Sequence, residues 1–175
     1  MAPVTVLVVI EPKQYTIQSE PYGEAYRRLL DLASVRCSTF TLIIQPLLAK
    51  TERLDELRPQ GRQLIESLAL YCVEQAEVTA WPGTELLGGT RSATIYRYTL
   101  NGLSVVLLKK AADRLYAWMQ PDLPEDPCFY TADGGVWLAT IAHEGEAFVR
   151  LTSDCKAALD GSIPELRLIL DESEV

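Results

Sequence analysis

A glycine pair between two strand-like runs constrains the fold of this chain more than any other feature. Cys128 to Ala132 and Val136 to Ala142 flank Gly134-Gly135, and this arrangement is typical of a tight antiparallel hairpin. Because side chains alternate between the two faces of a strand, the loop also decides which side chains share a face. At least part of the sheet is therefore expected to be antiparallel.

The register of this hairpin predicts a group of reactive side chains. With Gly134-Gly135 as the loop, Cys128 lies opposite Ile141 and Asp126 lies opposite His143. The first face then holds Asp126, Cys128, Tyr130, Trp137, Ala139, Ile141 and His143, and the second holds Phe129, Val136, Leu138, Thr140 and Ala142. A two-residue loop that begins one residue earlier moves the partners by two and keeps both faces. A three-residue loop exchanges the partner faces.

The first third of the chain predicts a strand, a helix and a second strand. Pro3 to Ile10 is a continuous apolar run of the kind found in strands buried on both faces. After Pro21, apolar residues recur at helical spacing, namely Ala25, Tyr26, Leu29, Leu30 and Ala33. Ser38 to Gln45 reads as the second strand. This order opens an α/β unit.

The middle of the chain predicts a helix, a loop and a second hairpin. Thr51 to Leu57 is a short helix or a turn, and a longer helix follows Pro59 with one apolar stripe, namely Leu64, Ile65, Leu68, Cys72 and Ala76. Thr79 to Thr90 reads as a loop with a turn at Pro82-Gly83. The predicted hairpin joins Ala93 to Leu100 with Leu103 to Lys109 through Asn101-Gly102.

The last third predicts short elements around the first hairpin. A short helix from Ala111 to Met119 should turn Leu115, Trp118 and Met119 inward. The later elements are a strand Phe148 to Leu151, a helix Asp154 to Leu159 and an edge strand Leu166 to Leu170. We therefore expect an α+β (or α/β) fold with a mixed sheet, as a single globular domain over residues 1–175 that ends in a flexible acidic tail, 171–175.

The charge of the chain is uneven. Its 175 residues carry a net charge of −8, and residues 122–175 alone hold 3 basic and 12 acidic side chains, a balance of −9. An acidic surface repels phosphate and attracts basic partners. With a pI of about 4.7 and dispersed arginines and lysines, no nucleic-acid partner is expected.

Compartment signals are few. No apolar run approaches the roughly 20 residues that span a bilayer, and no cationic segment precedes Val4 to Ile10 as a signal peptide requires. We therefore expect a cytoplasmic protein without a membrane partner. The four cysteines form no CxxC pair, so buried, reduced thiols are expected rather than a zinc site.

Two kinds of chemistry can be weighed at the hairpin. Cys128 could act as a nucleophile with His143 as its base and Asp126 or Glu144 orienting the imidazole, since a thiolate needs a nearby base or cation. With this pair the protein would be a small hydrolase or transferase. The other reading is that Cys128 is a buried thiol with a structural role. Carboxylates could also surround Mg²⁺, namely Glu125, Asp126, Asp133, Glu144 and Glu146. A solvated acidic rim is favoured over that site, so no metal or other cofactor is predicted.

Common catalytic signatures are absent. His143-Glu144 begins the HExxH zinc pattern, but residue 147 is Ala. No GxxxxGK[ST], GxGxxG after a strand or GxSxG occurs either.

The residues therefore favour a non-catalytic binding or inhibitory module with a protein partner. Its candidate binding residues are Trp81, Glu125, Asp126, Trp137, His143, Glu144 and Glu146. The acidic third favours a basic partner surface, and an immunity-like inhibitor of a basic toxin is one concrete form. A third alternative is a small-molecule pocket beneath Trp81 and Trp137.

Four motifs together suggest a family. The segments Trp81-Pro82-Gly83-Thr84, Leu123-Pro124-Glu125-Asp126 with Cys128-Phe129, Trp137-Leu138 and His143-Glu144 resemble those of small bacterial proteins without an established activity. The resemblance covers roughly residues 81–151, and Pro127 stands where that family carries leucine. It implies a bacterial cytosolic protein and assigns no catalytic residue.

Overall fold

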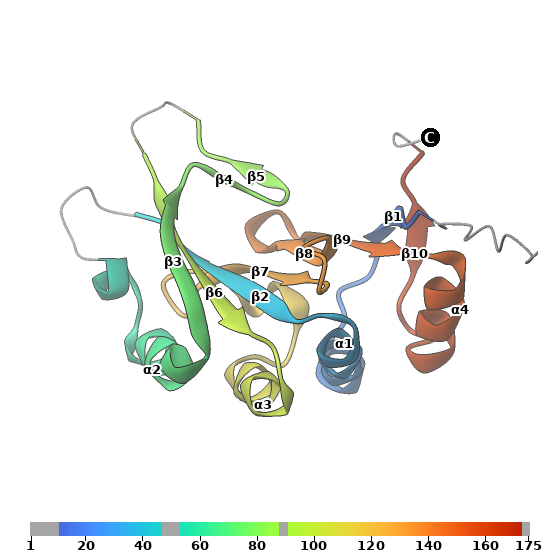
Figure 1. The fold of residues 1–175 in the computed structure, drawn as a ribbon, viewed down its shortest axis with the longest axis horizontal. Coiled ribbons are helices and arrows are strands. Elements are labelled where there is room, and N and C mark those ends of the chain that lie inside the picture. Colours follow the sequence, from blue (N-terminus) through green and yellow to red (C-terminus); the bar gives the residue numbers. More distant parts are fainter. Residues whose placement is uncertain (1–10, 47–52, 88–90, 173–175) are drawn as a thin grey trace, which may run out of the picture.

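The computed structural model describes residues 11–46, 53–87 and 91–172. Figure 1 shows one broad sheet with helices beneath it. The strands of this sheet are β1 (Lys13–Ile17), β2 (Thr39–Ile44), β3 (Cys72–Val78), β6 (Ala93–Thr99), β7 (Glu125–Tyr130), β8 (Val136–Ile141), β9 (Glu146–Leu151) and β10 (Leu168–Leu170). The helices are α1 (Gly23–Arg36), α2 (Pro59–Leu68), α3 (Gly102–Ala111) and α4 (Ser153–Ser162). Short 3₁₀ turns are η1 (Arg53–Glu56), η2 (Ala69–Tyr71), η3 (Leu115–Ala117) and η4 (Ala142–Glu144).

The sheet is antiparallel throughout its described pairings. Its strand order is β10-β1-β9-β8-β7-β2-β6-β3. The α+β class is confirmed. The strand-helix-strand order is present as β1, α1 and β2, but β1 and β2 are separated by three strands, so they form no parallel pair.

The two faces of the sheet are covered differently. The four long helices lie on one face, and a two-stranded hairpin, β4 (Ala80–Trp81) and β5 (Thr84–Glu85), lies over the other (Figure 1). The helical face holds the main core, which includes Phe40, Leu42, Phe129 and Leu138. Burying each such side chain contributes about 1.5–3 kcal/mol. The strands at the centre of the sheet are therefore the best-anchored part of the fold.

Several predicted elements are confirmed. The helix after Pro21 is α1, and its predicted inward residues Tyr26, Leu29, Leu30 and Ala33 are buried. The second strand, the late strand and helix, and the edge strand correspond to β2, β9, α4 and β10. The predicted first strand, Pro3 to Ile10, lies outside the described residues.

The hairpin predicted at Asn101-Gly102 is wrong. Ala93 to Thr99 forms β6, but the chain then enters α3, for which Asn101 is the N-cap. The Asn101 side chain accepts hydrogen bonds from the backbone of Leu103 and Ser104, and Ser104 Oγ accepts one from the Asn101 backbone. This capping box satisfies the first free N–H groups of the helix, and Asn-Gly here starts a helix instead of turning a hairpin.

Three other boundaries differ from the prediction. The helix after Pro59 ends at Leu68. Cys72 and Ala76, which were expected on its apolar stripe, belong instead to the edge strand β3, which pairs with β6. The predicted loop after Thr79 contains the β4–β5 hairpin turning at Pro82-Gly83. Only the short turn η3 forms within the predicted helix that ends at Met119, and Met119 is 41% exposed although Leu115 and Trp118 are buried.

The expectations about membrane-spanning segments and about the cysteines can be checked on the described residues. None of their helices is long and apolar enough to cross a membrane. The four cysteines are all free. Cys37 and Cys128 are buried as expected, whereas Cys72 is exposed and Cys155 half-buried.

Candidate metal centre

The opening hairpin is confirmed as β7 and β8, but its register differs from the first alternative. Cys128 pairs with Ala139 and Phe129 with Leu138, which is the register shifted by two residues. The pairing then slips, so that Tyr130 pairs with Val136. This bulge moves Val136 to the face of Cys128 and Trp137 into the main core on the other face.

A second bulge, between β7 and β2, shapes the far end of the hairpin. Thr41 pairs with Cys128, but Ile43 pairs with Glu125, so β7 holds extra chain around Asp126. Asp126 has a φ of 51°, a region that non-glycine residues adopt rarely. Thr140 Oγ1 donates a 2.6 Å hydrogen bond to the backbone oxygen of Pro127 within this irregular stretch. The bulge turns the Asp126 side chain toward the end of β8.

The Asp126 carboxylate is buried and accepts two hydrogen bonds. Its exposed fraction is 1%. Trp81 Nε1 donates to Oδ2 at 2.8 Å, and the backbone N–H of Ala142 donates to Oδ1 at 2.8 Å. These two donors come from the β4–β5 hairpin and from the start of η4. The carboxylate therefore joins three separate segments of the chain.

The Glu125 carboxylate lies beside Asp126 and is held by glutamines. Its exposed fraction is 9%. Gln45 Nε2 donates to Glu125 Oε2, and the backbone of Gln120 also donates to the carboxylate. Gln45 and Gln120 are bonded to each other twice, through Gln45 N to Gln120 Oε1 at 2.6 Å and Gln120 Nε2 to Gln45 O at 3.0 Å. This pairing fixes the position from which Gln45 reaches Glu125.

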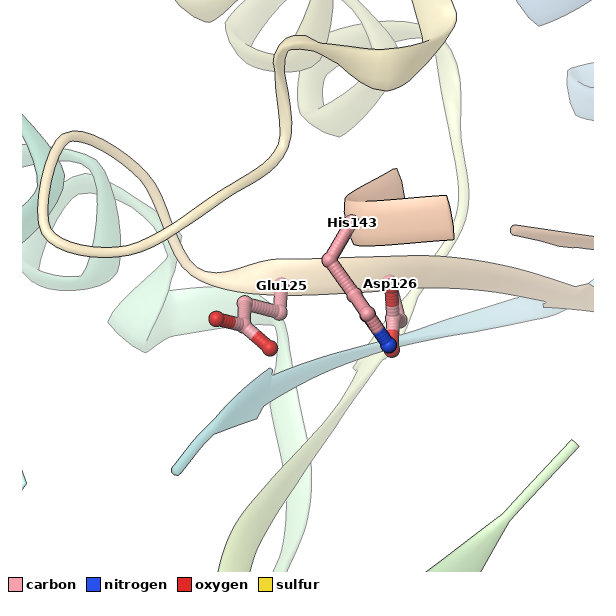
Figure 2. Close-up of side chains that lie close together, drawn as sticks. All are labelled: Glu125, Asp126 and His143. Atoms are coloured by element: carbon pink, nitrogen blue, oxygen red, sulfur yellow. The ribbon is translucent and has the colours of Figure 1, made fainter. Parts of the chain in front are cut away.

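His143 completes the group from the turn η4. Figure 2 shows its ring reaching toward Asp126, with Glu125 on the same strand as Asp126. One ligand atom from each of the three side chains lies within 4.8 Å of the others. The imidazole is 47% exposed, and its Nε2 lies 3.7 Å from Glu144 Oε1. The cluster is thus buried on its carboxylate side and open to solvent on its histidine side.

Burial controls the electrostatics of the two carboxylates. Desolvation raises the pKa of Glu125, and the neighbouring charge of Asp126 raises it further. Desolvation also raises the pKa of Asp126, although the hydrogen bonds from Ala142 and Trp81 oppose the shift. No lysine or arginine of the described residues pairs with either carboxylate, and the interaction with the nearby His143 lowers the pKa of both.

The three side chains fit the first shell of a divalent cation. Two ligand atoms on one ion with bonds of about 2.0–2.2 Å lie at most ~4.4 Å apart, so small rotations bring these atoms within binding distance. Carboxylate oxygens and an imidazole nitrogen suit Mn²⁺, Fe²⁺ or Zn²⁺. Each carboxylate oxygen keeps a lone pair besides its hydrogen bond. The bonds from Trp81, Ala142 and Gln45 would serve as the outer shell that orients the ligands.

The surroundings of Cys128 do not activate its thiol as the predicted nucleophile. Cys128 is 2% exposed, and burial raises the pKa of its thiol to about 12. Its hydrogen-bond partner is Tyr130, which lies under the Arg97 guanidinium at 4.4 Å. The thiol is therefore neutral near pH 7, whereas an attacking cysteine needs a lowered pKa. Of the predicted group, Asp126 and His143 do meet.

The predicted binding residues divide into two sets. Trp81, Glu125, Asp126 and Trp137 are buried, and His143, Glu144 and Glu146 are exposed. The tryptophans are thus not the exposed loop aromatics that a partner surface would need. Asp133 lies at the hairpin tip, apart from the cluster.

Sequence reasoning missed Gln45 and Gln120. Each stands directly before a proline. The only sequence signal for either residue was a polar side chain at the end of an apolar run. Their role depends on contacts between segments about 75 residues apart, and no local pattern carries that information.

Comparison with known proteins finds no relatives to guide the assignment. No family model matches the chain, and neither the curated proteins nor the solved structures contain a significant match. The resemblance to small bacterial proteins stays a prediction, and the function must be argued from the residues themselves.

Proposed function

We propose that the protein is a non-catalytic binding module that takes up a divalent cation at Glu125, Asp126 and His143. In this proposal the cation fixes the turn from Ala142 to Glu146 and shapes the surface that a partner meets. The proposal refines the predicted binding module by giving it a metal-dependent centre.

The observation that supports the proposal is an unbalanced pair of buried charges. Glu125 and Asp126 are adjacent, 9% and 1% exposed, and face no lysine or arginine among the described residues. Burying a charge without a counter-charge is costly, and proteins pair such groups, protonate them or bind a metal there. A bound cation would neutralise both carboxylates, and the half-exposed imidazole would supply a third ligand.

The partner side of the proposal rests on charge around the same turn. Glu144 and Glu146 are exposed beside His143, within a segment, residues 122–175, of balance −9. A basic protein surface is the partner of matching chemistry. The immunity-like form of the module remains part of this proposal.

Titration with Mn²⁺ tests the cation site. Isothermal calorimetry of the full chain should give one site, and E125Q and H143Q should weaken it by at least about 10-fold, as losing a ligand does. Because Trp81 donates to Asp126, Mn²⁺ should also change tryptophan fluorescence, and W81F should remove that change.

The matched control is D133N, which removes a carboxylate at the opposite end of the same hairpin. It should bind Mn²⁺ like the wild type. Absence of saturable binding, or equal weakening by D133N and E125Q, would overturn the proposal.

A further inference from the structure

A cavity lies apart from the cation centre, at the N-terminal end of α1. It holds about 300 Å³ between the chain that leads into α1 and the chain that leads into β10, and its lining comes from within residues 19–25 and from Glu165 and Leu166. It shares no lining residue with the cation centre. Its lining therefore has to be explained separately.

Hydrogen bonds join the two segments that form the walls of this cavity. The backbone N–H of Gln18 donates to the backbone oxygen of Arg167 at 2.8 Å. Beside it, Ser19 Oγ donates to the backbone oxygen of Glu165 at 3.3 Å. The protein itself therefore sets the spacing of the walls, as in ligand pockets that are formed before binding.

The interior of the cavity is apolar and its rim carries an aromatic ring. Pro21 and Leu166 are buried and Ala25 is half-buried. Tyr22 also lines the cavity but is 70% exposed, so it stands at the rim. Tyrosine is enriched at protein interfaces and among the residues that dominate their binding energy. The cavity thus suits a chain of methylene groups that enters from a partner surface.

Every charged side chain that lines the cavity is a glutamate. Glu20 accepts a hydrogen bond from the Tyr116 backbone N–H at 2.9 Å, and Glu24 lies 3.6 Å from Arg28. The carboxylate of Glu165 has no hydrogen bond or ion pair within the described ranges of the chain. One carboxylate of the lining is therefore free to pair with a cation that enters.

Two arginines approach the cavity from outside without lining it. One is Arg28, which pairs with Glu24. The other is Arg114, which donates to Asp113 Oδ1 at 3.2 Å; this bond and the charges of Asp113 and Glu20 raise its pKa. Both guanidinium groups are thus engaged at the outer side of the lining glutamates.

We propose that this cavity receives a lysine side chain of the basic partner, an inference that rests on the partner side of the proposed function. The methylene chain of the lysine packs against Pro21, Ala25 and Leu166, and its ammonium group pairs with Glu165. Tyr22 contacts the partner surface next to that lysine. Lysine fits because it joins an apolar stem to a compact positive charge, whereas the acidic lining disfavours an anion.

The peptide acetyl-Ala-Lys-Ala-amide is the probe. In ¹⁵N NMR titrations of the full chain, it should shift the amides of residues 19–25 and 165–166 in a saturable way. Two changed peptides separate charge from stem: one carries acetylated lysine, which is neutral, and one carries diaminopropionic acid, whose stem is three methylenes shorter. Each should bind at least about 5-fold more weakly.

Two variants identify the site. E165Q should weaken binding about 2- to 5-fold, as expected for an ion pair that stays partly exposed. A25L should weaken it at least about 10-fold, because the larger side chain occupies the cavity and two groups cannot share a close-packed space.

The matched controls are E66Q and A157L, which change an exposed glutamate of α2 and an exposed alanine of α4, both outside the cavity. They should bind the probe like the wild type, and the spectrum of each variant checks its fold.

Four results overturn the lysine pocket. These are no saturable shift up to about 10 mM probe, shifts centred away from the cavity, equal binding of the acetylated peptide, or equal binding by E165Q and E66Q. Repeating the titration with a chelator separates this pocket from the cation centre. If Mn²⁺ binds and the probe does not, the pocket is wrong; if the probe binds and Mn²⁺ does not, the cation centre is wrong.

Discussion

Asp126 and Asp133 lie at opposite ends of the same strand pair, and their pKa values are shifted in opposite directions. Asp126 is buried, and desolvation raises its pKa despite bonds from Ala142 and Trp81. Asp133 is exposed in the turn, and bonds from Thr131 and Gly135 lower its pKa. Both carboxylates accept strong hydrogen bonds, so hydrogen bonding does not explain the difference.

Burial therefore decides the charge balance at each end of the strand pair. At the tip, water and local donors stabilise the aspartate charge without help. At the buried end, two donors are not enough to offset desolvation, and Glu125 adds a second carboxylate. A bound cation would therefore stabilise the carboxylates at the buried end, whereas the aspartate at the tip needs none.

The largest contrast should come from two glycines with similar backbone angles. Gly83 has a φ of 84° and Gly134 a φ of 85°, so alanine is strained at both by about 1–2 kcal/mol. A Cβ on Gly83 would lie 2.6 Å from Ile141 Cδ1, whereas a Cβ on Gly134 meets nothing within 4 Å. Overpacking adds about 1–3 kcal/mol, so G83A should destabilise by about 2–5 kcal/mol in urea unfolding. Equal losses for G83A and G134A would show that the β4–β5 hairpin is not packed on β8.

A second contrast removes one donor from each aspartate. W81F leaves Asp126 Oδ2 buried without its 2.8 Å donor, which should cost about 1–3 kcal/mol of unfolding free energy. T131V removes the hydroxyl bond to Asp133 at an exposed turn and should cause no measurable loss, because water replaces the donor. Urea unfolding of both variants provides the comparison. A larger loss for T131V would contradict the assigned roles of the two ends.

The smallest contrast is a difference in pH dependence, measured with a chelator present. A carboxyl whose folded pKa is raised above its ordinary 3.8 stabilises the fold below that value and loses this contribution as pH rises through the folded pKa. A carboxyl whose folded pKa is lowered stabilises the fold above 3.8 and loses this contribution as pH falls. D126N should therefore reduce the loss of stability with rising pH, and D133N the loss with falling pH. Profiles parallel to the wild type for both variants would refute the opposite shifts.

The hairpin shows what local pattern can predict. Alternation and the glycine turn correctly placed Cys128 with Ala139 on one face and Phe129 with Leu138 on the other. The bulge after Phe129 then exchanged Val136 and Trp137 between the faces. Bulges depend on contacts across the sheet, so a period of two cannot reveal them.

Asp126 and His143 lie close together, but the cause is not the predicted register. Their proximity follows from the second bulge and from the Ala142 N–H that holds the Asp126 side chain. Burial raises the pKa of Asp126, and one of the hydrogen bonds that oppose this shift comes from Trp81, 45 residues away in the sequence. The candidate residues could be named from the sequence, but their burial could not.

Asn101-Gly102 shows the ambiguity of a strong local signal. The pair favours a two-residue hairpin, but Asn is equally favoured as an N-cap. Ser104 at the third helical position was the distinguishing signal, because it completes the capping box. Turn chemistry alone did not decide between the two.

A crystal of the full chain soaked with Mn²⁺ tests most directly whether Glu125, Asp126 and His143 bind a cation. We expect one anomalous peak at about 2.0–2.4 Å from a Glu125 oxygen, an Asp126 oxygen and a ring nitrogen of His143. Saturating Mn²⁺ without a peak at these three side chains, or with peaks only at exposed carboxylates such as Asp133, would contradict it.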